Sequence, residues 1–152
     1  MEPGLLWVLL LAAVPFIEIF FAIPFGVALR LDPVAVTLAA FIGNLLPLPV
    51  LALLQERLAR RWPRLLGGLP LRPQSRRGAR VRRALARWGI PGLALQSPII
   101  TGTHITVPIA LALGANRRRT LTWMGIALAL WSPVITLVAV IGIEGIRRLL
   151  GW

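Results

Sequence analysis

The stretch that decides the fold is Gly89–Arg119, GIPGLALQSPIITGTHITVPIALALGANRRR. It carries no formal charge from Gly89 to Gly114, so it could enter a membrane. Three prolines, at positions 91, 98 and 108, remove backbone donors, which makes a straight helix unfavourable. Broken helices persist at membrane depth only where protein or a water-filled cavity surrounds them. Two structures fit: a kinked span, or a re-entrant hairpin with a polar tip near the midplane.

The arginines around this stretch favour the hairpin. Eleven lie in Arg57–Arg87 before it, and three more, Arg117–Arg119, follow it. Cytoplasmic loops collect Lys and Arg, so both clusters are expected in the cytoplasm, and the segment between them must cross the membrane twice or not at all. Its 26 uncharged residues are too few for two crossings of roughly 20 residues each. About 12 residues in and 12 back would reach roughly 18 Å, past the midplane of a core about 30 Å thick.

Composition indicates an all-α integral membrane protein. The chain has 152 residues, 57% of them hydrophobic, and a mean hydropathy of +0.80. Apolar runs with the lengths of membrane segments are Leu5–Leu29, Val34–Leu54, Gly89–Gly114 and Thr120–Ile143. The net charge of +12 comes from arginine alone, grouped beside apolar runs. This grouping favours a role in membrane topology and attraction to anionic lipid headgroups over nucleic-acid binding.

No set of catalytic residues stands out. The sequence has no cysteine, one histidine, no cluster with metal-ligand spacing and no phosphate-binding glycine loop followed by lysine. We therefore expect no enzyme activity, no metal site and no cofactor.

The first half leaves two structures open. Pro15, Glu18 and Pro24 interrupt Leu5–Leu29, which could be a second re-entrant hairpin or one kinked span. Asp32-Pro33 then reads as a helix start, with aspartate as the N-cap and proline in the first turn. Val34–Leu54 follows as a full span.

A weak internal repeat relates the two halves. Pro24 matches Pro108, and Asp32 falls opposite Asn116 at the same offset. The first half would end in the cytoplasm and the second outside, which predicts opposite topologies, a pattern typical of transporters. The expected organisation is a first hairpin-and-helix repeat over 1–56, a basic cytoplasmic loop over 57–88, in which Ala79–Trp88 forms an interfacial helix, and a second repeat over 89–152.

The motifs resemble a known family. Glu18 followed by Ala22-Ile23-Pro24, and Gly43-Asn44 followed by Pro47-Leu48-Pro49, resemble the small multidrug export proteins, which are similar to DedA-type membrane proteins. The resemblance implies two membrane-embedded hairpins that face each other, transport or lipid translocation, and the plasma membrane of a bacterium or archaeon. One departure is Phe20, where the family pattern leads us to expect an arginine.

Glu18 is the leading site candidate, because a carboxyl group inside an apolar run must be paired or hydrated, and can exchange protons. It could also be a solvated interfacial residue. His104 could relay protons or satisfy a neighbouring carbonyl. The further substrate or coupling candidates are Thr101, Thr103, Ser97, Asn44 and Asp32. Arg117, Arg118 and Arg119 are expected to set topology and to bind lipid headgroups.

Two functions follow. The first is a small transporter that performs proton-coupled export or lipid flipping through a site between the hairpins. The second is a non-transporting membrane scaffold that binds anionic lipid or a partner protein through the arginine-rich loop. Two spans and two hairpins would surround a transport path with only a thin layer of protein, so we also expect a homodimer or larger oligomer.

Overall fold

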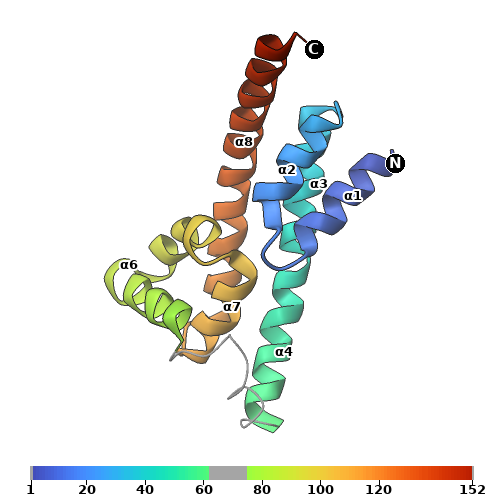
Figure 1. Ribbon diagram of the computed structural model, residues 1–152. Coiled ribbons are helices and arrows are strands. Elements are labelled where there is room, and N and C mark those ends of the chain that lie inside the picture. Colours follow the sequence, from blue (N-terminus) through green and yellow to red (C-terminus); the bar gives the residue numbers. More distant parts are fainter. Residues whose placement is uncertain (1, 62–74, 152) are drawn as a thin grey trace. The chain divides into compact units, whose positions relative to one another are not determined.

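The computed structural model describes residues 2–61 and 75–151, and within these ranges the chain is helical without a strand. The helices, labelled in Figure 1, are α1 Pro3–Ala13, α2 Glu18–Ala28, α3 Pro33–Leu45, α4 Pro47–Arg61, α6 Arg76–Ile100, α7 Thr103–Ala112 and α8 Arg117–Leu150. The predicted all-α class is therefore confirmed. Residues 62–74 of the expected cytoplasmic loop lie outside the described residues.

Two continuous helical stretches are long and apolar enough to cross a membrane. They are Pro33–Leu58, with 26 residues, and Arg117–Leu150, with 34 residues. At 1.5 Å per residue they extend roughly 39 and 51 Å, more than the hydrocarbon core of about 30 Å. They contain the two predicted spans. The first is divided into α3 and α4 at Leu46, whose backbone is itself helical, and the second contains Pro133.

The chain forms two compact units. Unit 1 consists of Met1–Leu46 and Leu128–Trp152, and unit 2 of Pro47–Ala127. Each unit contains one pair of short helices together with part of each long helix. The long helices thus contribute to both units.

In unit 1 the short pair is α1 and α2, joined by a turn over 14–17. Each has 11 residues, roughly 17 Å, which is too short to span a membrane. Residues 5–29 therefore form two helices joined by a turn and not one continuous helix. Both helices pack on α3. The approach of α1 is close, since a Cβ atom at Gly43 would lie 2.1 Å from the Leu9 carbonyl oxygen.

Side-chain hydrogen bonds hold the end of α8 in unit 1. The Thr37 and Thr136 hydroxyls lie 2.7 Å apart and join α3 to α8. Further along α8, an Arg147 Nη donates to the Ala28 carbonyl at 3.0 Å, which satisfies an orphan acceptor at the C-terminus of α2. The outer turns of α8 are therefore anchored to both α2 and α3.

In unit 2 the short pair consists of the second half of α6 and α7. Residue Gly89, with φ of 64°, divides α6 into a basic arm over 76–88 and an apolar arm over 90–100. The chain then turns at Thr101 and Gly102 into α7, which packs on α4 and α6. The helix predicted over Ala79–Trp88 is confirmed as the basic arm. The arms that flank the turn have 11 and 10 residues, close to the lengths of α1 and α2.

The backbone repeats its unusual conformations at one spacing. Glu18 and Arg30, which bracket α2, have φ values of 48° and 58°. Gly102 and Gly114, which bracket α7, have φ values of 81° and 89°. Each second residue lies 84 positions after its partner. Left-handed backbone is uncommon, and α2 and α7 share it at both ends with the same spacing.

The same offset joins a proline and a helix cap. Pro24 lies inside α2 and Pro108 inside α7, again 84 positions apart. Asp32 and Asn116 both accept a hydrogen bond from the backbone N–H three residues later, at 2.8 and 3.0 Å respectively. Both side chains therefore cap the start of a long helix. The predicted match of Asp32 with Asn116 thus corresponds to a shared structural role.

Candidate functional site

Glu18 is buried in an unusual backbone conformation. It is the first residue of α2 and only 3% exposed. Its φ of 48° and the φ of 78° at Phe16 both lie in the left-handed region. Such a conformation costs a non-glycine residue of order 1–3 kcal/mol, and it occurs most often at functional sites. The surrounding structure thus holds a buried carboxyl group in a conformation that the chain would not adopt on its own.

Asn44 lies at the same level of unit 1 as Glu18. The turn between α2 and α3 separates the two helices, with Glu18 ten residues before Ala28 and Asn44 eleven residues after Pro33. At 1.5 Å per residue both lie roughly 15–17 Å from that turn. Asn44 is fully buried. The structure therefore places these two candidates at one end of the α2–α3 pair.

Asp32 lies at the opposite end of that pair. It is exposed, and its carboxylate accepts the backbone N–H of Ala35 as the N-cap of α3. This role accounts for the residue type without a function in coupling.

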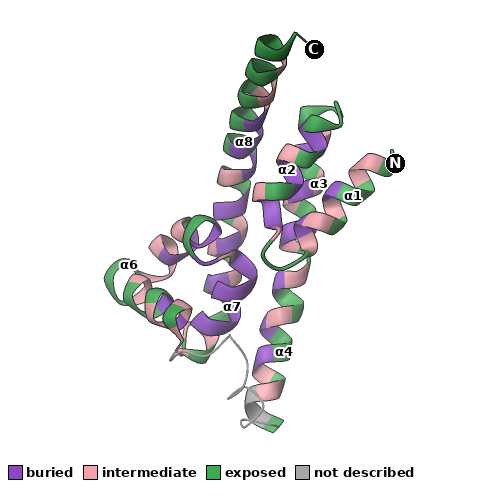
Figure 2. Ribbon diagram, in the orientation of Figure 1, coloured by how far each residue is buried: buried purple, intermediate pink, exposed green. Residues whose placement is uncertain are grey.

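The polar residues of the second short pair are gathered at its turn. Ser97, Thr101, Thr103, His104 and Thr106 are all at most 9% exposed. Figure 2 shows how thoroughly α7 is buried, and every residue over 103–110 is in the buried class. A helix without an exposed stripe over eight residues is unusual, and its polar groups lie in a poorly hydrated environment.

Three hydroxyls at or near this turn have hydrogen-bond partners, and those of Thr101 and Thr106 close the turn. The Thr106 hydroxyl donates its hydrogen to the Gly102 carbonyl at 2.7 Å. In the hydrogen bond between Thr106 and Thr101, the donor is therefore the Thr101 hydroxyl. Ser97 donates to the Ala94 carbonyl at 2.9 Å and lies 3.2 Å from the Met124 sulfur. Thr103 and His104 are buried beside these hydroxyls. Thr106 was missing from the predicted site, although its place among four polar residues in six was a signal for it.

The arginines that start α8 lie beside the end of α4. Arg117 donates to the Glu56 carboxylate at 3.1 Å, and both side chains are partly exposed. A pair this exposed contributes little to stability. The pair does show that the beginning of the basic loop and the Arg117–Arg119 cluster lie at the same end of unit 2.

The described residues contain no group of three or more His, Cys, Asp or Glu side chains that could bind a metal ion. What the two turns offer is a buried carboxyl group in one unit, and a buried histidine with threonine hydroxyls in the other.

Comparison with known proteins gives one match. Residues 18–134, which are 117 of the 152 in the chain, match the family described as putative small multi-drug export protein. The match begins at Glu18 and includes α2, both arms of α6, α7 and the start of α8. Among curated proteins and among solved structures, none matches the chain.

Proposed function

The chain belongs to the small multi-drug export family, and from this premise we propose that it is a membrane exporter in which proton binding at Glu18 is coupled to substrate movement. The observation that carries the proposal is the repeated unit. A pair of short helices with a buried polar group at its turn precedes an N-capped helix long enough to cross a membrane, and this arrangement occurs twice.

The lengths of the short helices support re-entrant hairpins. Arms of 10 or 11 residues extend roughly 15–17 Å, about half of the 30 Å core. A pair of such arms that enters from one face would place its turn near the midplane. Glu18 and His104 lie at those turns, where a transporter with inverted repeats binds its substrate and coupling ion.

The composition of the two units supports an inverted repeat. In unit 1, α1 and α2 are joined to α3, the start of the first long helix, and to the end of α8. In unit 2, α6 and α7 are joined to α4, the end of the first long helix, and to the start of α8. Each pair is thus held by the beginning of its own long helix and the end of the other. The same description therefore applies to the first half of the chain and to the second.

We assign the coupling step to Glu18. A carboxylate in a dry site is costly unless its charge is compensated. Either a proton or a cationic substrate can supply that compensation, but both cannot do so together. Competition between them couples proton entry to substrate release, and it points to lipophilic cations as the first substrates to examine.

The test is flux in proteoliposomes that hold the purified chain. With an imposed pH gradient, we expect movement of the lipophilic cation ethidium, measured by its fluorescence, to exceed that in protein-free vesicles and to stop when a protonophore collapses the gradient. Equal movement in protein-free vesicles would contradict export. A second experiment uses vesicles that contain a fluorescent phospholipid. Flipping of this lipid without ethidium flux would show that the protein moves lipid and not the cation. Flux of neither would favour the scaffold.

A further inference from the structure

A cavity of about 270 Å³ lies between the two arms of α6. It belongs entirely to unit 2. The basic arm contributes three arginines, Arg80, Arg83 and Arg87, and the apolar arm contributes Leu93, Gln96 and Ile100. Pockets for small molecules have volumes of about 300–1,000 Å³, so this cavity suits a compact group rather than a whole drug-sized molecule.

The three guanidinium groups have no carboxylate partner in their own unit. Residues 57–143 contain no aspartate or glutamate, and the single acidic residue of unit 2, Glu56, is paired with Arg117. Arg83 uses its Nε to donate to the Ala79 carbonyl at 3.4 Å, which leaves both of its Nη groups for a ligand. Three cations at one opening therefore favour an anion from outside the unit, and guanidinium groups match phosphate oxygens best.

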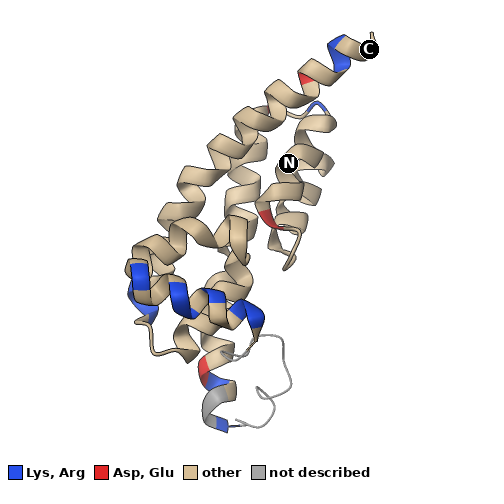
Figure 3. Ribbon diagram, turned by 60° about the vertical axis from the view of Figure 1, so that its left-hand side comes forward, with Lys and Arg blue, Asp and Glu red and all other residues tan. Residues whose placement is uncertain are grey.

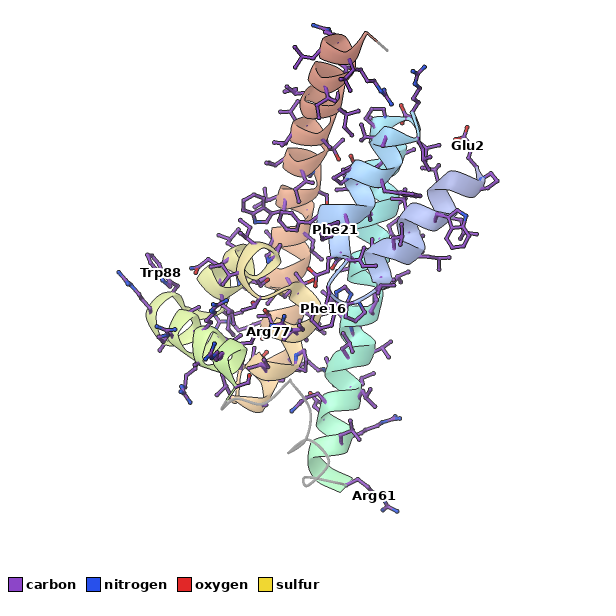
Figure 4. The ribbon with its side chains drawn as sticks, in the orientation of Figure 1. Glu2, Phe16, Phe21, Arg61, Arg77 and Trp88 are labelled. Carbon is purple, nitrogen blue, oxygen red and sulfur yellow. The ribbon has the colours of Figure 1, made fainter. Side chains whose placement is uncertain are left out.

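Apolar side chains from both arms also line the cavity, beside the polar Gln96, Ser97 and Thr101. Leu93 is buried, while Ile100 and Trp88 are about half exposed. The guanidinium of Arg87 lies 5.1 Å from the centre of the Trp88 ring. Figure 4 labels Trp88 at the bend of α6, and Figure 3 shows arginines along the basic arm. An exposed tryptophan next to arginines is typical of the headgroup level of a membrane.

The bend that creates the cavity depends on glycine. Gly89 has a φ of 64°, a conformation that glycine adopts without penalty. Three residues later, a Cβ atom at Gly92 would lie 2.2 Å from the Cβ of Trp88. Both glycines allow the basic arm to lie over the apolar arm with its arginines at the opening.

We propose that this cavity binds an amphipathic phosphate, with the phosphate between Arg80, Arg83 and Arg87 and the adjoining apolar part on Leu93 and Ile100. The source is an anionic membrane phospholipid, which combines the two chemistries and is present where the basic arm meets the membrane. The site is separate from Glu18 and does not depend on export.

The experiment compares two adjacent arginines. Arg83 lines the cavity, whereas Arg82, exposed on the same arm, does not. Binding of short-chain phosphatidylglycerol and phosphatidylcholine to the detergent-solubilised chain is measured by native mass spectrometry. We expect saturable binding of phosphatidylglycerol alone, weakened about tenfold by Arg83→Gln, the effect of one charge-assisted hydrogen bond, and less than twofold by Arg82→Gln. Equal weakening by both would reduce the effect to general attraction by a basic helix and overturn the site.

A second variant fills the cavity without changing its charge. Ala84 also lines the cavity, so Ala84→Phe should abolish phosphatidylglycerol binding. Unchanged binding would overturn the proposal. Inorganic phosphate distinguishes the source: we expect it to compete only in large excess, and competition at equal concentration would show a site for free phosphate instead of lipid. If the unmodified protein bound both lipids equally while its ethidium flux was intact, this site alone would be refuted.

Discussion

Glu18→Gln is expected to abolish pH-driven export. The substitution keeps the size of the side chain and its ability to hydrogen-bond, but the amide cannot exchange a proton or compensate a cation. Glu18 is the first residue of α2 and is 3% exposed, so in the variant bulk water cannot take over the role of the lost carboxylate. We expect ethidium flux under a pH gradient to fall at least about tenfold, toward that of protein-free vesicles, because the coupling group is lost entirely.

The matched control is Glu144→Gln, the same chemical change at an exposed position of α8. This variant should keep the flux and pH profile of the unmodified protein. Elution volume in size-exclusion chromatography should be the same for both variants, which separates coupling from folding. A Glu18→Gln protein whose flux retains its dependence on the pH gradient would remove Glu18 from the mechanism.

Gly43→Ala is expected to disrupt unit 1. The added Cβ atom would lie 2.1 Å from the carbonyl oxygen of Leu9 and 2.9 Å from its carbonyl carbon, both in the backbone of α1. A backbone cannot rotate away as a flexible side chain can, so α1 must move off α3. Overpacking of this kind costs typically about 1–3 kcal/mol. We expect a lower thermal midpoint in detergent and a smaller yield of monodisperse protein.

Gly145→Ala is the control for this change. It lies inside α8, and a Cβ atom there would have no neighbour within 4 Å. Alanine favours a helix over glycine by about 0.8–1 kcal/mol, so this variant should be as stable as the unmodified protein or more stable. If Gly43→Ala melts at the same temperature as Gly145→Ala, α1 does not pack on α3 as described.

Hydropathy and helix-capping rules were enough to predict the long helices. Asp32 and Asn116 fell opposite each other in the sequence, and both cap a helix in the structure, as short polar side chains before an apolar run commonly do. The division of Leu5–Leu29 could not be predicted, because its turn uses left-handed backbone at Phe16 and Glu18. Residue preferences argue against that conformation for both residue types. Tertiary packing, which no local pattern reports, must impose it.

The turn between α6 and α7 was easier to predict than the cavity beside it. Gly102 sits between two threonines in a proline-rich run, and glycine there is an ordinary signal for a turn. The cavity arises because the bend at Gly89 brings together residues of two arms, such as Arg80 and Ile100, which are 20 positions apart. Sequence spacing shows that Arg80, Arg83 and Arg87 share a helix face. It does not show what that face covers.

The inverted repeat is the central claim, and the accessibility of two equivalent positions tests it most directly. Leu31 and Ala115 are 84 residues apart and follow α2 and α7 respectively. The chain contains no cysteine, so Leu31→Cys and Ala115→Cys each introduce a unique thiol.

The measurement is the labelling of intact cells and of inverted vesicles with a membrane-impermeant maleimide. Leu149→Cys, where leucine is 88% exposed near the end of α8, and Arg76→Cys, at the start of α6, mark the two faces. We expect positions 31 and 149 to react from outside and positions 115 and 76 from the cytoplasm. Reaction of positions 31 and 115 from the same side would contradict the inverted repeat.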